Sequence, residues 1–394
     1  MTSHSPRSAQ RTQSSGKVIS ALFACSAVIV SSLFWSQALL SHGSVTTTVL
    51  FDREIVRILD KHCVMCHSEG SLSFPLETYE QTWLQGKKIR AGVLARHMPP
   101  WAPVAGYGQF ANENRLTLRE SQFIVSWVEG LGPRNAGTVF ANVVDAGARP
   151  PAVRAVAHSG HWPLAEPDLT LVLPPTTIEP RQPDEVRRID VPTDLASARW
   201  IRGLEFVPGD RRVVRAAFFS VQETGQWIGS WTPWYGFVEL PAGAAYRLPA
   251  GSHVVAEIHY RGASEAVVDG GMLGLLFART AALATVSDIR LEAKGTAAAT
   301  GRGQRFRGEM RVAADTHAFA FRPDSVSGVK SLEVALRTPD GGTEVLLYAN
   351  DLPADWPTPY LFATPRLLRR NSVLSVTAYR DTGAAPLSFT ISRY

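Results

Sequence analysis

Three residues, Cys63, Cys66 and His67, have the types and the spacing to hold a redox cofactor. They form a C-x-x-C-H motif, the attachment signature of a c-type haem. In such a site the two thiols add to the haem vinyl groups, and the adjacent histidine directs its imidazole at the iron. The alternatives are a chance match or a thiol–disulfide pair, but the adjacent histidine and the helix expected just before the motif favour haem. The sequence therefore predicts one covalent haem c.

A sixth ligand to the iron should come from a later loop. Met98 lies 31 residues after His67, within Arg-His-Met-Pro-Pro-Trp at 96–101. Because two prolines cannot continue a helix, they keep this segment extended, so that a thioether can lie across the haem face. Neighbouring residues of an extended segment point to opposite sides, so only His97 or Met98 can reach the iron. We expect Met98 to be the ligand, with core packing as its alternative role, and His62 to be a surface or propionate-side group.

The elements that must position these side chains are predicted to be helices. Apolar residues recur at helical spacing over residues 51–61 and again over 116–128, and Gly and Pro residues then end the pattern. We expect a small all-α domain over 48–133. Residues 134–160 are rich in Ala, Gly, Pro and Arg and are expected to form a linker.

Further residues around the motif form a specific pattern: Phe74-Pro75-Leu76 with Tyr79, Met98-Pro99-Pro100-Trp101, Phe110-Ala111-Asn112, Leu116, Glu120 and Trp127-Val128. With these residues, the segment 55–133 resembles a small class I cytochrome c domain. The version it resembles is fused, in many bacterial proteins, ahead of a copper type II ascorbate-dependent monooxygenase-like domain. The resemblance implies that Cys63 and Cys66 hold the haem and that His67 and Met98 bind its iron.

From residue 161 to 394 the pattern changes to short β segments separated by Gly, Pro and Asp. Many short strands without intervening helices indicate sandwiches or barrels. Because this region is long for one sandwich, we expect two stacked, jelly-roll-like β-sandwiches over 161–285 and 286–394. The expected strands are 169–173, 186–191, 213–219, 254–260, 273–277, 318–322, 332–336, 345–348 and 373–379.

The β region has its own pattern: Trp162 with Glu166-Pro167-Asp168, Pro208 to Val214, His259-Tyr260, Gly328 and Pro339-Asp340-Gly341. With these residues, the segment 161–382 resembles the copper monooxygenase-like domain itself, more weakly than the first domain resembles a cytochrome. The resemblance implies two copper sites with six ligands.

Five of those six ligand positions are not filled by the family's residues. Arg215 and Ala216 stand where two histidines are usual, Pro323 and Ser325 stand where a His-x-His is usual, and no methionine follows Met310. Only His259 matches its position. A type II copper needs about three protein donors in fixed geometry. We therefore expect no copper, and we expect His259 to be a buried, hydrogen-bonded histidine.

A tryptophan-rich stretch over residues 227–234 has two interpretations. It could form part of the core with a hairpin tip, which we favour, or an aromatic surface that binds a ligand or contacts the haem domain.

Residues 18–40 form a long apolar run after a basic, Ser-rich leader, so residues 1–44 are expected to be a signal peptide or an uncleaved membrane anchor. Cys25 lies in this run and is a weak match to a lipoprotein site. Both interpretations, with the positive-inside rule, put the rest of the chain outside the cytoplasm, in the periplasm. If the run is not cleaved, residues 18–40 would anchor the chain to the membrane.

The charge balance, 40 basic against 35 acidic residues, is only +5, and no basic stripe with interleaved aromatics indicates a nucleic-acid partner. We expect a non-enzymatic electron carrier that exchanges electrons with a periplasmic or membrane redox protein. Its β region would then be a catalytically inactive scaffold. The alternatives are a copper monooxygenase (a hydroxylase) that receives electrons from the haem and, more weakly, a haem sensor with an open iron site.

Overall fold

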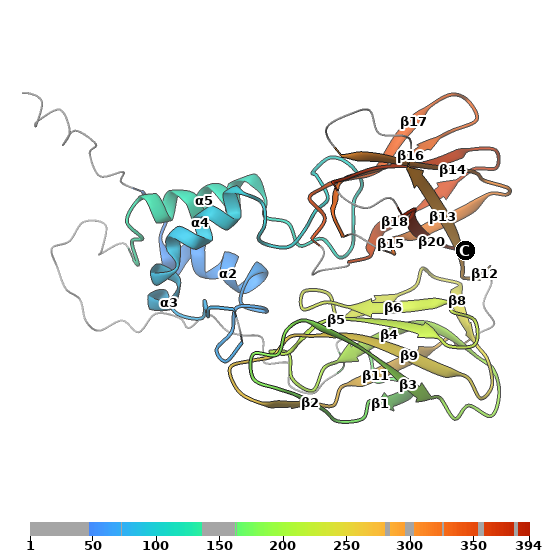
Figure 1. Ribbon diagram of the computed structural model, residues 1–394, viewed down its shortest axis with the longest axis horizontal. Coiled ribbons are helices and arrows are strands. Elements are labelled where there is room, and N and C mark those ends of the chain that lie inside the picture. The colour runs from blue at the N-terminus through green and yellow to red at the C-terminus, as the bar shows by residue number, and fades with distance from the viewer. Residues whose placement is uncertain are drawn as a thin grey trace, which may run out of the picture.

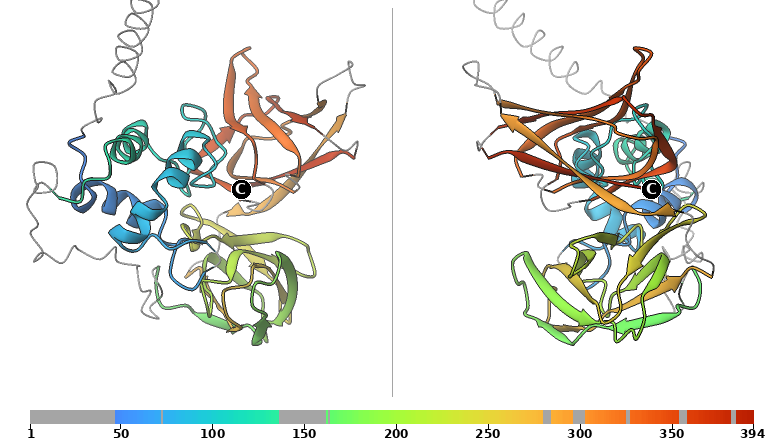
Figure 2. Two further views of the ribbon diagram at one scale, coloured as in Figure 1. Left: turned by 60° about the vertical axis from the view of Figure 1, so that its left-hand side comes forward. Right: turned by 90° about the vertical axis from the view of Figure 1, so that its right-hand side faces the viewer.

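The computed structural model describes residues 47–71, 73–135, 162, 164–279, 284–295, 303–324, 327–353, 358–381 and 385–394. The apolar run 18–40, Cys25 and nearly all of the expected linker lie outside these residues. A helical unit lies beside two β units, which are placed one above the other (Figure 1). The same arrangement is visible from two further directions (Figure 2). Within the described residues, no helix has both the length and the apolar character needed to cross a membrane.

The helical unit confirms the two helices expected from spacing. Its elements are η1 (Phe51–Ile55), α2 (Val56–His62), α3 (Tyr79–Leu84), α4 (Gly86–Leu94) and α5 (Leu118–Glu129). Two of them begin with a capping box, in which Thr78 pairs with Gln81 and Thr117 pairs with Glu120. The apolar sides of these helices meet around the buried side chains of Phe51, Leu59 and Trp127.

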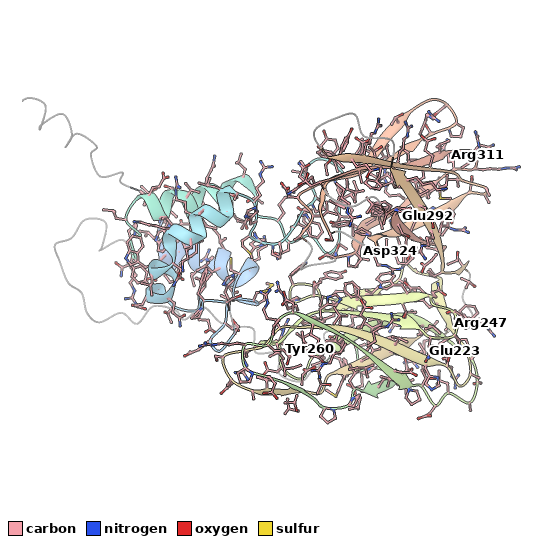
Figure 3. The ribbon with its side chains drawn as sticks, in the orientation of Figure 1. Glu223, Arg247, Tyr260, Glu292, Arg311 and Asp324 are labelled. Atoms are coloured by element: carbon pink, nitrogen blue, oxygen red, sulfur yellow. The ribbon has the colours of Figure 1, made fainter. Side chains whose placement is uncertain are left out.

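In the remaining described residues every regular element is a strand, as expected for an all-β region, and their side chains are drawn in Figure 3. The strands are β1 (Leu169–Val172), β2 (Thr176–Ile178), β3 (Glu185–Pro192), β4 (Arg199–Val207), β5 (Val214–Val221), β6 (Trp227–Trp231), β7 (Phe237–Glu239), β8 (Ala244–Leu248), β9 (His253–Tyr260), β10 (Val267–Asp269), β11 (Met272–Phe277), β12 (Ala284–Thr285), β13 (Ser287–Gly295), β14 (Gln304–Arg311), β15 (Thr316–Pro323), β16 (Val329–Arg337), β17 (Thr343–Asn350), β18 (Tyr360–Leu368), β19 (Val373–Arg380) and β20 (Leu387–Arg393).

The first β unit consists of two main sheets packed face to face. One has the strand order β1-β11-β4-β8-β12 with β7 attached to β4, and the other has the order β3-β9-β5-β6. Their facing side chains share one core, in which the rings of Phe206 on β4 and Phe219 on β5 lie 5.2 Å apart. This is a sandwich, and β5 and β9 of the second sheet extend toward the helical unit (Figure 1).

The second β unit differs from the expected sandwich of two separate sheets. It is one eight-stranded curled sheet with the order β17-β16-β19-β14-β13-β20-β15-β18. Residues Ser287 to Ala293 of β13 pair with β20, whereas Lys294 and Gly295 pair with β14, so β13 passes from one half of the sheet to the other. The two halves enclose a single core. The right-handed twist of adjacent strands allows such a sheet to curl over itself.

Candidate functional site

The end of α2 and the turn after it bring the cysteine–histidine motif together. The amide of Cys63 still donates to the Leu59 carbonyl at 2.8 Å, so the first cysteine continues the helix. The amides of Cys66 and His67 both donate to the Cys63 carbonyl at 3.0 Å, which closes a tight turn. As a result, all three side chains line one pocket.

The environment of the two thiols favours their protonated form. They are not joined in a disulfide. Burial, with a smaller contribution from the neighbouring Cys66, raises the pKa of the Cys63 thiol to about 12. Burial also raises the pKa of the Cys66 thiol to about 12, although Arg215 and Arg211 oppose this shift. Reactive C-x-x-C pairs have a lowered thiol pKa, so this environment is unlike that of a thiol–disulfide catalyst.

The imidazole of His67 is oriented by one hydrogen bond. Its Nδ1 lies 2.9 Å from the carbonyl oxygen of Phe74, and its ring packs on the Phe74 ring at 4.8 Å. Burial lowers the pKa of His67, and the hydrogen bond to Phe74 offsets this only in part. A neutral imidazole that donates from Nδ1 keeps its Nε2 lone pair for a metal. His67 could therefore bind a metal through Nε2.

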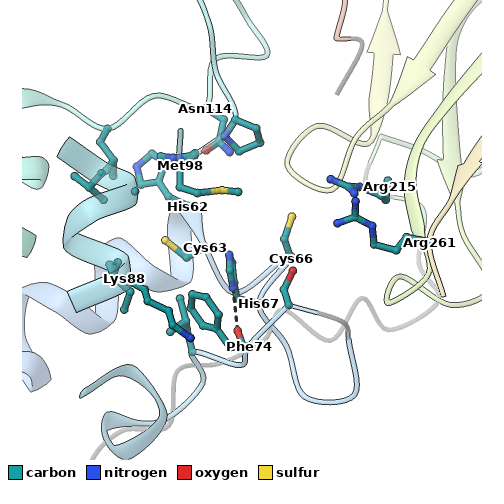
Figure 4. Close-up of a pocket in the computed structure, with 18 residues that line it drawn as sticks. His62, Cys63, Cys66, His67, Phe74, Lys88, Met98, Asn114, Arg215 and Arg261 are labelled. Atoms are coloured by element: carbon teal, nitrogen blue, oxygen red, sulfur yellow. Dashed lines mark hydrogen bonds between the residues drawn. The ribbon is translucent and has the colours of Figure 1, made fainter. Parts of the chain in front are cut away.

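Met98 reaches the same pocket from the opposite side. It follows the turn after α4, where its amide donates to the Gly92 carbonyl at 3.4 Å. Met98 and His67 point into one space, with the sulfur atoms of Cys63 and Cys66 on either side (Figure 4). His97 lines a neighbouring pocket instead. Of the two candidate ligands at this turn, Met98 is therefore the one that faces His67.

The pocket contains about 800 Å³ of space, part of it open to solvent. Most of its wall is apolar, with Leu76, Ile89, Val93 and Leu116 among the lining side chains. The ammonium of Lys88 lies 5.6 Å from the Phe74 ring centre at its rim. An apolar pocket with a few fixed polar groups is the usual form of a cofactor site.

His62 is not at the surface, so that interpretation was wrong. Its side chain is 4% exposed, and its Nδ1 lies 2.9 Å from Oδ1 of Asn114. Its Nε2 lies 3.4 Å from Oε1 of Glu120. His62 belongs to the pocket wall and ties α2 to the start of α5, because a buried ring nitrogen needs a hydrogen-bond partner.

The first β unit contributes two arginines to this pocket, which sequence reasoning did not anticipate. Arg215 on β5 and Arg261 just after β9 point toward Cys66 (Figure 4). Nη1 of Arg215 lies 3.3 Å from Asp184, and Arg261 donates two hydrogen bonds of 2.5 Å to the same carboxylate. The sequence identified Arg215 only as a cation at a copper position, because no local pattern reveals that it lies beside Cys66, about 150 positions away.

The copper positions implied by the resemblance are only partly brought together. Nε2 of His259 lies 3.3 Å from Glu257, and its ring packs against Phe218 at 5.3 Å, so His259 is hydrogen-bonded but only partly buried. His259 and Pro323 line one pocket between the two β units, and Ser325 lies outside the described residues. Across the described part of the chain, no cluster of three or more His, Cys, Asp or Glu side chains could hold a metal ion.

Both interpretations of the tryptophan-rich stretch apply, each to different residues. Trp227 and Trp231 are buried in the core of the first β unit. Trp234 instead donates from Nε1 to the Asn112 carbonyl at 3.2 Å and thereby contacts the segment that follows Met98.

Comparisons with known proteins identify no family. No family model and no curated protein matches the chain. Among solved structures, a Paenibacillus xanthan lyase is 10% identical with a TM-score of 0.20. The alignment covers 57% of this chain and only 25% of the lyase. The T=1 Penaeus vannamei nodavirus is 8% identical with a TM-score of 0.17, over 57% of this chain and 97% of that one. Vicilin from Capsicum annuum is 11% identical with a TM-score of 0.13, and the alignment covers 53% of this chain and 75% of the vicilin.

Proposed function

We propose that the chain is an exported c-type cytochrome that carries one covalent haem for one-electron transfer. The observation that carries this proposal is the convergence of Cys63, Cys66, His67 and Met98 on one apolar pocket. The redox partner would be a periplasmic or membrane protein, and residues 18–40 would export the chain or anchor it to the membrane.

The residues present fit a haem. The two thiols flank the pocket, the Nδ1 hydrogen bond of His67 leaves Nε2 for a metal, and Met98 faces this imidazole across the space. When bound, the haem supplies an iron centre that accepts and releases one electron.

In this proposal each residue has one task. Cys63 and Cys66 fix the group covalently, and the Phe74 carbonyl sets the orientation of His67. Met98 would supply a second protein ligand to the iron, and a methionine paired with a histidine raises the reduction potential. The apolar wall would limit the access of water to the bound group.

The β region would act as a scaffold without its own redox chemistry. At the first copper position, the guanidinium of Arg215 is ion-paired with Asp184 and turned toward Cys66. A guanidinium has no acceptor lone pair, so Arg215 cannot replace a histidine as a copper ligand at this position.

A second candidate is a copper monooxygenase supplied with electrons by the haem. The observation in its favour is that His259 and Pro323, two positions that the resemblance assigns to separate coppers, line one pocket between the β units. Hydroxylation of an added substrate by copper-loaded protein would support this candidate over the carrier.

The carrier proposal is tested by maturing the chain in an oxidising compartment with haem-attachment machinery. Wild type should retain haem after denaturation and titrate reversibly with one electron. The double variant Cys63→Ser, Cys66→Ser should carry none. Cys25→Ser is the matched control, because it removes the remaining cysteine and should leave the haem in place. Haem loss from all variants, wild type included, would refute the proposal.

A further inference from the structure

The segment 99–112 leaves the helical unit and runs along the second β unit. It bridges β17 and β18, the strands at the two ends of the described sheet order. Four backbone hydrogen bonds of 2.7 to 3.2 Å run from the amides of Val104, Asn350, Ala111 and Ala363 to the carbonyls of Tyr348, Ala102, Leu361 and Gln109. Edge strands present unpaired backbone groups, so this segment, which we call the strap, covers part of both edges.

Two aromatic side chains anchor the strap in the core of the second β unit. Trp101 and Phe110 are only 8% and 7% exposed and belong to the same apolar cluster as the sheet residues. The Trp101 ring lies 5.7 Å from Tyr360, and the Phe110 ring stacks on Phe362 at 5.5 Å. Burial of large aromatic rings is a major source of packing energy, so these contacts hold the strap to the sheet.

Asn112 fixes the far end of the strap to both β units. Its Nδ2 donates to the Pro359 carbonyl at 2.6 Å, and its Oδ1 accepts from the Leu361 amide at 3.0 Å. Its own carbonyl accepts the 3.2 Å hydrogen bond from Trp234 of the first β unit. Buried side-chain amides with several partners specify a unique position.

Both ends of the strap lie at the candidate haem pocket. At the start, only Pro99 and Pro100 separate Met98 from the anchored Trp101, and proline fixes φ and leaves little slack. At the end, Asn114 lies two residues after Asn112 and contacts His62 in the pocket wall. Met98, Pro99, Pro100 and Asn114 all line the pocket.

We propose that the second β unit holds Met98 at the iron through this strap, so that Trp101, Phe110 and their partner Phe362 are positioning residues for the axial ligand. The inference rests on the proposed function, because Met98 matters as a ligand only if a haem is present. It assigns the β scaffold a definite task, which is to keep the sixth position of the iron closed.

The experiment substitutes one residue of the second β unit and measures the reduction potential and the carbon monoxide binding of the haem iron. Phe362→Ala removes the ring that stacks on Phe110 without altering any pocket residue. We expect the haem to remain covalently attached, the reduction potential to fall, and the reduced iron to change from inert to stoichiometric binding of carbon monoxide. The milder Phe362→Leu should fold normally and show a smaller shift in the same direction, and Phe362→Tyr should restore wild-type values.

The matched control is Phe206→Ala, which removes a ring that is more deeply buried (2% exposed against 8% for Phe362) and belongs to the core of the first β unit rather than to the core that holds the strap. It should leave the potential and carbon monoxide binding unchanged. Wild-type values in folded Phe362→Ala, or equal changes in both variants, would overturn the strap proposal.

Amide hydrogen exchange separates this proposal from the haem proposal. The amides of His97 and Met98 bond to the Gly92 carbonyl and report on the turn that carries Met98. Their exchange should accelerate in Phe362→Ala and not in Phe206→Ala, with or without haem. Absence of haem from wild type would refute only the carrier function, whereas unchanged exchange would refute the strap.

Discussion

The Met98 side chain is 46% exposed, which is high for a large apolar residue at the wall of a pocket. Burial alone therefore gives this thioether little reason to face His67. A metal bond would supply that reason, since soft thioether sulfur binds haem iron opposite histidine.

Replacing Met98 by alanine should open the iron while leaving the haem attached. We expect a lower reduction potential, because the methionine ligand favours the reduced iron, and we expect carbon monoxide to bind. His97→Ala is the matched control at the adjacent position, whose side chain lines a different pocket. If His97→Ala produced these changes and Met98→Ala did not, the assignment of the ligand would have to be exchanged.

Among the elements, α5 is tied to the motif through Glu120 at its first turn. The carboxylate accepts from the Thr117 amide at 2.7 Å and from Lys61 at 3.2 Å, and it lies 3.4 Å from His62. Partial burial opposes ionisation, but hydrogen bonds from the Thr117 backbone and side chain and from Lys61 outweigh it and lower the pKa of Glu120 to about 2. The ionised carboxylate thus links α5 to the helix that carries Cys63.

Glu120→Gln should therefore destabilise the helical unit in a pH-dependent way. A lowered folded-state pKa stabilises the fold fully above the unfolded value of 4.5, and this contribution disappears as the pH falls toward 2. We expect a loss of about 0.5 kcal/mol at neutral pH, because glutamine keeps the capping box and only the charge interactions with Lys61 and His62 are lost, and we expect a smaller difference in acid. The measurement is urea unfolding followed by the helical far-ultraviolet signal.

Glu129→Gln at the other end of α5 is the control for this prediction. Glu129 pairs with Arg90 at an exposed position, and exposed ion pairs contribute little. A difference between Glu120→Gln and wild type that stays constant down to pH 2 would contradict the assigned role of the ionised carboxylate.

Helical structure over 51–61 and 116–128 and nine of the described strands could be predicted from sequence, because each depends on local patterns, whereas α3 and α4 were not predicted. Residues 51–61 and 116–128 repeat with helical spacing, and strands such as β9 and β16 appear as short apolar runs between turn residues. The surface alternative for His62 was wrong, and its burial could not be foreseen because its partner Asn114 lies 52 positions away. Likewise, the curled form of the second sheet depends on how β13 changes partners, which leaves no trace in its own residues.

At the scale of the whole molecule, the candidate pocket is assembled from more than the helical unit. The first β unit adds Arg215 and Arg261 beside Cys66, and the second holds the strap that carries Met98. Neither contribution could be read from the sequence, since the strap pairs with residues about 250 positions later, as Asn112 does with Leu361. The helical unit, which appears separable in sequence, is thus joined to both β units.

The central claim is tested most directly by the iron and copper content of the full-length protein, matured with haem-attachment machinery and then offered copper. One iron per chain, retained as covalent haem after denaturation, together with no copper is the result that the account predicts. One iron with one or two coppers would contradict the assignment of the β region as a scaffold and favour the monooxygenase. A chain without iron would contradict the assignment of Cys63, Cys66, His67 and Met98 as a haem site.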